Sequence, residues 1–189
     1  MCLDLQALID SIEGGALQGK ARVSLVLSNR YRSGILHRAA NHGIPAAFVS
    51  RKQCGGDDEA FYATMSDMFI GAGVELVLCI GYMHIIPSSF TRTWSGRLLN
   101  AHPSLLPSFK GLMDLEVYAQ VLAARDADAR DARLALPTTA TQVGGAAGAP
   151  VTGCTVHFVT DDVDGGPIVA QLATALTAAD TAESVLADL

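Results

Sequence analysis

The chain has 189 residues, of which 50% are hydrophobic and 17% charged, which is typical of one soluble globular domain over residues 1–189. Its formal net charge of −6 at pH 7 argues against nonspecific nucleic-acid binding, which needs a basic surface. The apolar runs have the length of strands, and no basic leader opens the chain, so we expect neither a membrane span nor secretion, but a cytoplasmic protein.

The first half of the sequence alternates helical and strand patterns. Residues Asp4–Glu13 place apolar side chains on one helical face, and two glycines follow. A buried strand is predicted over Arg22–Leu27, a helix over Tyr31–Asn41 and a short strand over Ala46–Val49. A helix over Asp57–Ile70 opens with acidic residues, which suit a helix N-terminus.

The next elements continue this alternation as far as a segment of different composition. We predict a strand over Val74–Ile80, a short helix over Pro87–Trp94, a strand over Arg97–Ala101 and a helix over Leu112–Ala124. Residues 125–150 are rich in Ala, Gly, Thr and Asp and poor in large apolar side chains. Such a segment can bury little surface, so we expect a mobile insertion.

The last elements predict the fold class. Strands over Thr155–Val159 and Ile168–Leu176 are close enough in sequence to form a hairpin, and a helix is expected over Asp180–Leu189. Strands that alternate with helices predict an α/β fold with a Rossmann-like, mostly parallel sheet covered on both faces.

The cysteines give no sign of a metal or disulfide framework. They are scattered, and none forms a CxxC pair, so zinc and disulfides are not expected. These residues are Cys2, Cys54, Cys79 and Cys154.

Two segments contain the residues suited to chemistry. In RLLNAHPSLLP, Asn100 and His102 lie two residues apart at the end of a predicted strand, so their side chains share one face. In TVHFVTDDVDGGP, His157 lies within a strand, and Asp164 precedes two glycines that permit a tight backbone path. Taken singly, Asn100 and His102 also fit a helix cap and a structural histidine, and the acids fit a solvated turn.

Taken together, RLLNAHPSLLP and TVHFVTDDVDGGP resemble the paired signature of the glycinamide ribonucleotide transformylase family. VLCIGYMHIIP resembles that family's folate-pocket strand and loop, and VSLVLSN resembles its second strand. The resemblance covers nearly all of the chain outside residues 125–150. It implies formyl transfer from 10-formyltetrahydrofolate to the amine of glycinamide ribonucleotide, by a monomer or homodimer with no metal.

The resemblance also assigns roles to residues. It implies that Asn100, His102 and Asp164 are catalytic and that His157 shapes the site. On this basis Asn100 and a protonated His102 would donate to the formyl oxygen, and Asp164 would hold His102 charged. Folate contacts are expected from two short segments: Met83, His84, Ile85 and Ile86, and Thr160, Asp161, Asp162, Val163 and Asp164.

The chain also departs from the family pattern. Relative to that pattern, we expect the first strand with its glycine-rich loop, and the end of the last helix, to be absent. His84 stands where the family has an arginine, and Asp58 where it has a basic residue. We therefore expect weak folate binding and little turnover.

Other functions remain open from the sequence. Formyltetrahydrofolate deformylase is the nearest alternative, although HPS and GGP favour the transferase. Methionyl-tRNA formyltransferase has an HPSLLP-like loop but needs a second domain and a basic surface. A noncatalytic folate-binding protein of the same fold is the alternative from another class. A plain Rossmann nucleotide-binding module is disfavoured, because no GxGxxG follows the first predicted strand.

Overall fold

A computed structural model describes residues 3–112, 115–130, 151–177 and 179–182. By its internal contacts the chain forms two compact units, Met1–Leu98 and Leu99–Leu189. The expectation of a single domain stays a prediction. No helix among the described residues is long and apolar enough to cross a membrane.

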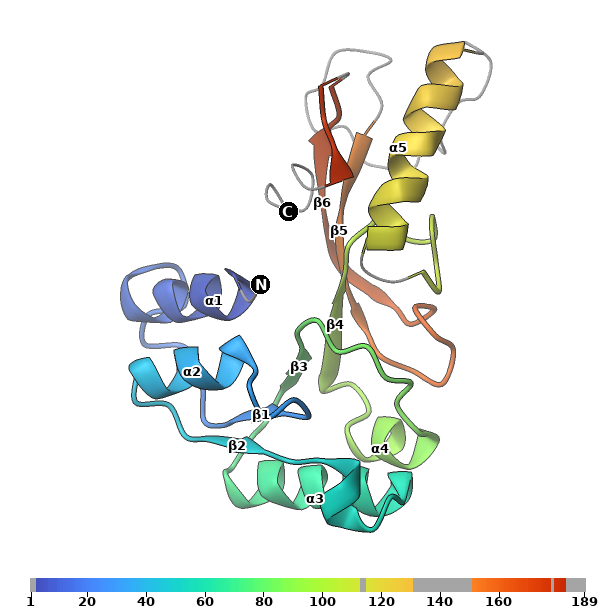
Figure 1. Ribbon diagram of the computed structural model, residues 1–189. Coiled ribbons are helices and arrows are strands. Elements are labelled where there is room, and N and C mark those ends of the chain that lie inside the picture. Colours follow the sequence, from blue (N-terminus) through green and yellow to red (C-terminus); the bar gives the residue numbers. More distant parts are fainter. Residues whose placement is uncertain (1–2, 113–114, 131–150, 178, 183–189) are drawn as a thin grey trace. The chain divides into compact units, whose positions relative to one another are not determined.

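The first unit combines helices with short strands. In chain order its elements are α1 (Leu3–Gly14), β1 (Val26–Ser28), α2 (Gly34–Asn41), β2 (Ala46–Phe48), the 3-10 helix η1 (Arg51–Cys54), α3 (Asp58–Gly71), β3 (Val77–Cys79) and α4 (Ser88–Thr93). Strands β1 and β2 pair in parallel, with Val26 opposite Ala46 and Ser28 opposite Phe48. Figure 1 shows α2 along one side of this strand pair and α3 along the other.

Helix starts in this unit follow from local capping. Ser33 accepts a hydrogen bond from the Ile35 amide at the start of α2, and Asp57 accepts one from the Glu59 amide at the start of α3. Ser50 and Gln53 form a capping box around η1. These caps fix the residues at which α2, η1 and α3 begin.

Two apolar clusters form the core of the first unit. One joins α1, β1 and α2 through Leu5, Ile9, Val26 and Ala39. The other is aromatic: Trp94 is 1% exposed, lies 5.8 Å from the Phe69 ring centre, and donates from Nε1 to Ser66 Oγ at 3.0 Å. Aromatic packing of this kind adds to the stabilisation that comes from area burial. Trp94 is therefore a core residue of the first unit.

The second unit is an antiparallel β-structure packed against one helix. Its strands β4 (Leu98–His102), β5 (Val151–Phe158) and β6 (Ile168–Ala175) are neighbours in that order. Strand β5 pairs antiparallel with both β4 and β6, with a bulge at Val156/His157. Helix α5 (Leu115–Arg130) runs beside the β5–β6 hairpin in Figure 1 and packs Val117, Tyr118 and Val121 against Leu176.

The structure confirms the types and order of the predicted elements and shifts several of their ends. The strands predicted over Arg22–Leu27 and Val74–Ile80 are shorter, because only Val26–Ser28 and Val77–Cys79 have a strand partner. The hairpin of the last two strands is confirmed. Most of the helix predicted from Asp180 lies outside the described residues.

The start of the predicted insertion is wrong. Residues 125–130 continue α5 as helix, while residues 131–150 lie outside the described part. Alanine and arginine favour helix, and the Arg125 guanidinium donates to the carbonyls of Thr177 at 2.7 Å and Asp180 at 3.0 Å. These two hydrogen bonds link the turn of α5 that contains Arg125 to the chain just after β6.

Candidate active site

Strands β4 and β5 place three polar side chains on one face of the second unit. Asn100 and His102 are two residues apart on β4, and Asn100 is directly opposite His157 on β5. His102 is 3% and His157 is 1% exposed. The Asn100 amide nitrogen lies 3.3 Å from His157 Nε2. The register of one antiparallel strand pair therefore brings together residues 57 positions apart in sequence.

Asp164, in the loop between β5 and β6, lies between the two histidines. Its Oδ2 is 3.5 Å from His102 Nδ1 and its Oδ1 is 3.6 Å from His157 Nε2. The Gly111 amide also donates to Oδ2, at 3.0 Å. We call Asn100, His102 and Asp164, together with His157, which is predicted to shape the site, the candidate catalytic set, or catalytic set for short. The structure thus brings together the trio predicted from the sequence and the histidine predicted to shape its site.

The glycines after Asp164 allow the loop to reach this position. Asp164 has φ 51°, in the left-handed region that non-glycine residues rarely adopt. A Cβ on Gly166 would lie 1.8 Å from the Phe158 carbonyl oxygen, a backbone atom that cannot simply rotate away. The chain can therefore fold back against β5 only with glycine at position 166.

The hydrogen bonds define the tautomer of His157. Its Nδ1 is 3.0 Å from the Phe158 carbonyl oxygen, which can only accept, so Nδ1 carries the proton. In the neutral ring Nε2 is then the acceptor for one Asn100 N–H. This bond orients the Asn100 amide, whose second N–H is left for another acceptor.

His102 is held in its neutral form in the free protein. Burial lowers its pKa below the ordinary value of 6.5, and this effect outweighs the opposing influences of Asp164 and of a hydrogen bond with the Phe109 backbone. The expectation that Asp164 keeps His102 charged is therefore wrong for the free protein. His102 Nε2 is buried and has no hydrogen-bond partner among the described residues, which leaves this atom available to a ligand.

A buried hydroxyl fixes the loop that follows His102. Thr155, opposite His102 on β5, donates to the Ser104 carbonyl at 2.6 Å and accepts from the Leu106 amide at 3.0 Å. Gln171 on β6 donates to both Thr155 Oγ1 and the Leu106 carbonyl, each at 2.9 Å. The sequence reasoning missed Thr155 and Gln171. The two-residue spacing from Thr155 to His157 is the signal that points to Thr155.

The predicted folate segment 160–164 is an exposed loop tied to its neighbour. Lys110 contacts both Asp162 carboxylate oxygens at 2.8 Å, and Thr160 Oγ1 donates to the Asp162 carbonyl at 3.2 Å. Val163 is 42% exposed. Asp162 thus lies in an exposed turn, as predicted, but its carboxylate pairs with Lys110. The sequence reasoning did not single out Lys110.

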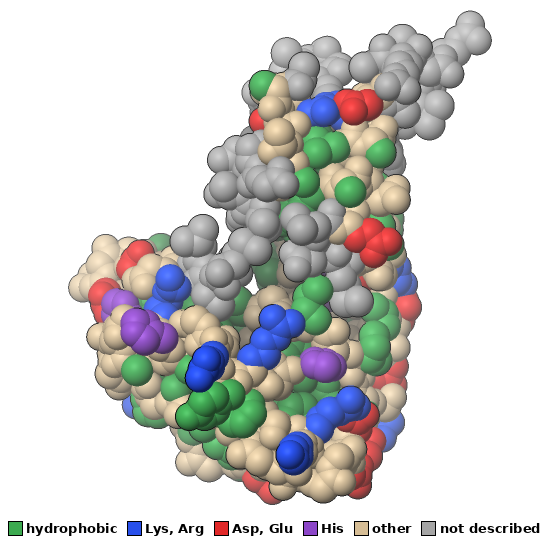
Figure 2. All heavy atoms as spheres, viewed as in Figure 1, with side chains coloured by type: hydrophobic (Ala, Val, Ile, Leu, Met, Phe, Trp, Pro, Cys, Tyr) green, Lys and Arg blue, Asp and Glu red, His purple; other side chains and the backbone are tan. Residues whose placement is uncertain are grey.

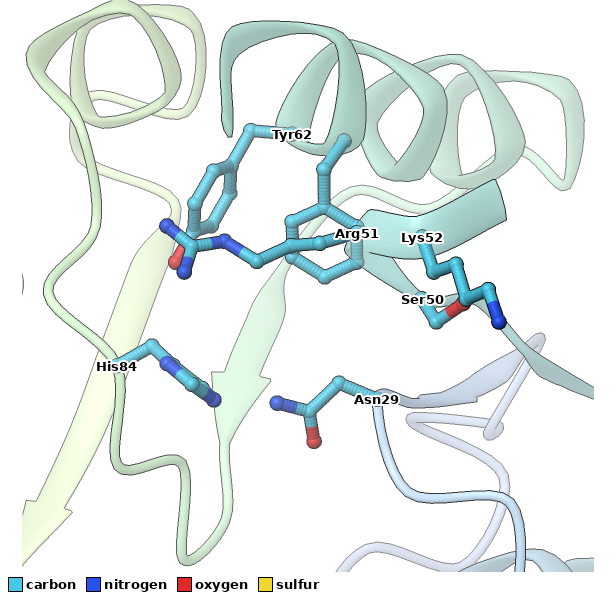
Figure 3. Close-up of a pocket in the computed structure, with 7 residues that line it drawn as sticks. Asn29, Ser50, Arg51, Lys52, Tyr62 and His84 are labelled. Carbon is cyan, nitrogen blue, oxygen red and sulfur yellow. The ribbon is translucent and has the colours of Figure 1, made fainter. Parts of the chain in front are cut away.

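The other predicted folate segment, Met83–Ile86, lies in the first unit. Ile85 is 71% exposed, while its carbonyl accepts a hydrogen bond from Tyr62 Oη at 3.1 Å. Beside this segment is a pocket of about 230 Å³. Figure 3 shows its lining: Asn29, Ser50, Arg51, Lys52, Phe61, Tyr62 and His84. We call it the basic pocket.

Cys54 and Cys79 form no disulfide, and burial raises the pKa of Cys79 to about 12, so that this thiol is protonated at neutral pH. Among the described residues, no group of three or more His, Cys, Asp or Glu side chains is placed to hold a metal ion. For polar chemistry, Asn100, His102, His157 and Asp164 offer an amide, two imidazoles and a carboxylate.

Comparison with known proteins identifies the family. The formyl transferase family matches residues 2–129 and 137–189. The phosphoribosylglycinamide formyltransferase of Haemophilus influenzae is 32% identical over 96% of this chain and 72% of its own length. The trifunctional purine biosynthetic protein adenosine-3 of Bos taurus is 36% identical over 96% of this chain, which spans only 15% of that protein.

Solved structures agree with this match. The glycinamide ribonucleotide transformylase 1 of Symbiobacterium toebii superposes with a TM-score of 0.77 at 32% identity, covering 98% of this chain and 74% of that one. A formyltetrahydrofolate deformylase from Pseudomonas syringae has a TM-score of 0.70 at 24% identity, which shows the fold alone. The predicted fold class and family resemblance are confirmed: the chain belongs to the formyl transferase family, among the phosphoribosylglycinamide formyltransferases.

Proposed function

We propose that this protein transfers the formyl group of 10-formyltetrahydrofolate to the amine of glycinamide ribonucleotide, a step of purine synthesis. The observation that carries the proposal is the position of Asp164 between His102 and His157, beside Asn100. The names of the relatives, which are formyltransferases of purine synthesis, support it.

In this reaction the catalytic set would stabilise charge and carry one proton. The neutral amine attacks the formyl carbon, and negative charge builds on the formyl oxygen. The second Asn100 N–H, oriented by the bond to His157, would donate to that oxygen. Because this donor is already oriented, the hydrogen bond forms without reorganisation as the charge develops.

His102 would act first as a base and then as an acid. In its neutral form Nε2 has a free lone pair, which takes the proton that the attacking nitrogen loses. Asp164, 3.5 Å from Nδ1, stabilises the imidazolium that results. His102 then returns the proton to the folate nitrogen as its bond to carbon breaks, leaving tetrahydrofolate and the formylated amine.

The protein would bind small molecules and act in the cytoplasm as a monomer or homodimer. Cys54 and Cys79, which form no disulfide, support a reducing compartment. Folate contacts would come from Met83–Ile86 and from Thr160–Asp164, where Met83, Ile85 and Val163 are exposed.

The test is formyl transfer from 10-formyltetrahydrofolate, followed by folate absorbance, with glycinamide ribonucleotide and with water alone. We expect product only with the ribonucleotide, and a loss of about 100- to 10,000-fold in rate for His102→Ala, which removes the proton carrier. His37→Ala removes an exposed imidazole from α2 as the matched control.

The other outcomes separate the alternatives. Formate released without the ribonucleotide would make the protein a deformylase. Folate binding with neither reaction would indicate a noncatalytic member of the family. An unchanged rate for His102→Ala would contradict the mechanism while leaving the transferase activity in place.

A further inference from the structure

Two residues of the loop between β3 and α4 are tied to α3 by a single side chain. Tyr62 Oη, on α3, donates a hydrogen bond to the Ile85 carbonyl at 3.1 Å and accepts one from Tyr82 Oη at 3.0 Å. We call the Tyr82 hydroxyl, the Tyr62 hydroxyl and the Ile85 carbonyl the tyrosine relay. It joins both sides of the loop to a residue that lies 20 and 23 positions earlier in the chain.

Tyr62 is a fixed point from which to hold this loop. It is 3% exposed, and its ring centre lies 5.1 Å from that of Phe61 and 5.3 Å from that of Phe90 on α4. Phe90 in turn lies beside Trp94, with 6.3 Å between the ring centres. In Figure 3 the Tyr62 ring extends from α3 toward the side on which His84 lies. Close packing of these rings fixes the rotamer of Tyr62 and therefore the position of its hydroxyl.

The residues between the two ends of the relay face solvent. Met83 is 37% and Ile85 is 71% exposed, and the His84 side chain is exposed as well. Figure 2 shows hydrophobic and basic side chains open to solvent on the face of the first unit that it presents. An exposed loop with few buried contacts opens easily. The relay restricts this loop before a ligand arrives, and such restriction lowers the ordering cost of binding.

The relay has a defined direction. Burial raises the pKa of both Tyr62 and Tyr82 above the usual value of a tyrosine, so both hydroxyls are protonated at neutral pH. A hydroxyl has one proton to donate, and Tyr62 donates it to the Ile85 carbonyl, so its lone pairs accept from Tyr82. Loss of the Tyr62 hydroxyl therefore breaks both hydrogen bonds, whereas loss of the Tyr82 hydroxyl breaks one.

We propose that Tyr62 and Tyr82 are positioning residues for folate binding, because the tyrosine relay holds segment 83–86 in the conformation that receives the folate. The inference rests on the proposed function, which assigns folate contacts to that segment. Tyr62 need not touch the folate, since it is buried and its proton goes to a protein carbonyl. The relay raises affinity rather than the rate of chemistry, because the catalytic set lies in the second unit.

The experiment compares Tyr62→Phe, Tyr82→Phe and the double variant with the control Tyr31→Phe, which changes a residue that is 74% exposed. Each substitution keeps the ring and removes only the hydroxyl. The dissociation constant of folic acid is measured on the full chain by titration calorimetry. The second measurement needs no ligand: it is the rate at which thermolysin, which cuts before apolar residues, cleaves ahead of Ile85 and Ile86. For active variants, KM for 10-formyltetrahydrofolate and kcat are measured as well.

We expect Tyr62→Phe to weaken folic acid binding by about three- to tenfold and to raise KM with kcat nearly unchanged. Tyr82→Phe should do less, because Tyr62 still holds Ile85. The double variant should match Tyr62→Phe, because Tyr82 acts only through Tyr62. Cleavage of the loop should become faster in the same order, and Tyr31→Phe should match the wild type in every measurement.

Wild-type affinity in Tyr62→Phe would overturn the proposal, and so would a double variant whose loss equals the sum of the two single losses. Faster cleavage with unchanged affinity would also overturn it, since the relay would then order the loop without serving folate binding. A wild type that binds no folic acid would contradict the proposed function itself, and the cleavage rates would still decide whether the relay holds the loop.

Discussion

The catalytic set and the basic pocket are built in opposite ways. In the second unit, His102 and His157 are almost fully buried, and every polar partner they have is supplied by the protein. In the first unit, Arg51, Lys52 and His84 are exposed, and the side chains of Lys52 and Asn29 have no partner among the described residues. Apart from His102 Nε2, the ring nitrogens of this network have protein partners, and such a buried network fixes geometry before the ligand arrives. An open basic pocket contributes charge whose effect falls with salt.

This contrast predicts that substitutions around the catalytic set lower stability as well as rate, whereas those in the basic pocket alter binding alone. Three measurements of stability test the first half of this prediction, and the variant with the greatest expected loss comes first.

Gly166→Ala should have the largest effect. Its Cβ would lie 1.8 Å from the Phe158 carbonyl, so the backbone near Asp164 must shift. We expect a loss of about 3 kcal/mol or more in the free energy of unfolding, measured with urea, together with reduced formyl transfer. Gly34→Ala is the matched control, because a Cβ there meets nothing within 4 Å. Equal stability of the two variants would show that the loop is not held against β5.

Thr155→Val tests the buried support of the loop after His102. It removes a hydroxyl that donates to Ser104 and accepts from Leu106 and Gln171. We expect a loss of about 1–3 kcal/mol in the free energy of unfolding, because buried partners are left unsatisfied.

Thr152→Val makes the same chemical change three positions away on β5. The Thr152 side chain is buried, and its hydroxyl has no partner among the described residues, so this variant should be neutral or more stable. If the two valine variants lose the same stability, the network around Thr155 contributes nothing beyond its methyl packing.

The sequence predicted the catalytic set better than its surroundings, for a physical reason. The shared face of Asn100 and His102 was predicted from a local rule, the two-residue repeat of a strand, whereas their catalytic role was implied only by the family resemblance. The motifs they share with Asp164 and His157 are continuous stretches of chain. Gln171 contacts Leu106, 65 positions earlier, and no local pattern indicates that pairing.

Charge and element ends were harder to predict. The neutral state of His102 follows from burial, which a sequence does not display, and the carboxylate of Asp164 suggested the opposite. The ends of β1 and β3 depend on where a partner strand lies opposite. The hydrophobic run of each segment is longer than the part that has a strand partner, so hydrophobicity alone does not indicate these ends. The extra turns of α5 show that a composition poor in large apolar residues still permits helix when Arg125 finds acceptors.

The smallest effect concerns pH and the protonation of His102. Burial lowers the pKa of His102 in the folded protein, while the unfolded chain keeps the ordinary value near 6.5. Between the two values the unfolded state holds more protons, so stability rises with pH across this window. The contribution of His102 is therefore complete above pH 6.5 and is lost as the pH falls toward the folded pKa.

The measurement is the free energy of unfolding between pH 7.5 and 5, for the wild type and His102→Asn. The wild type should lose more stability than the variant as the pH falls, and His37→Asn should follow the wild type, since it removes an exposed imidazole instead. Parallel curves for the wild type and His102→Asn would mean that Asp164 offsets the burial of His102. The ring would then not be held neutral, and the first step of the proposed proton transfer would have to begin from another group.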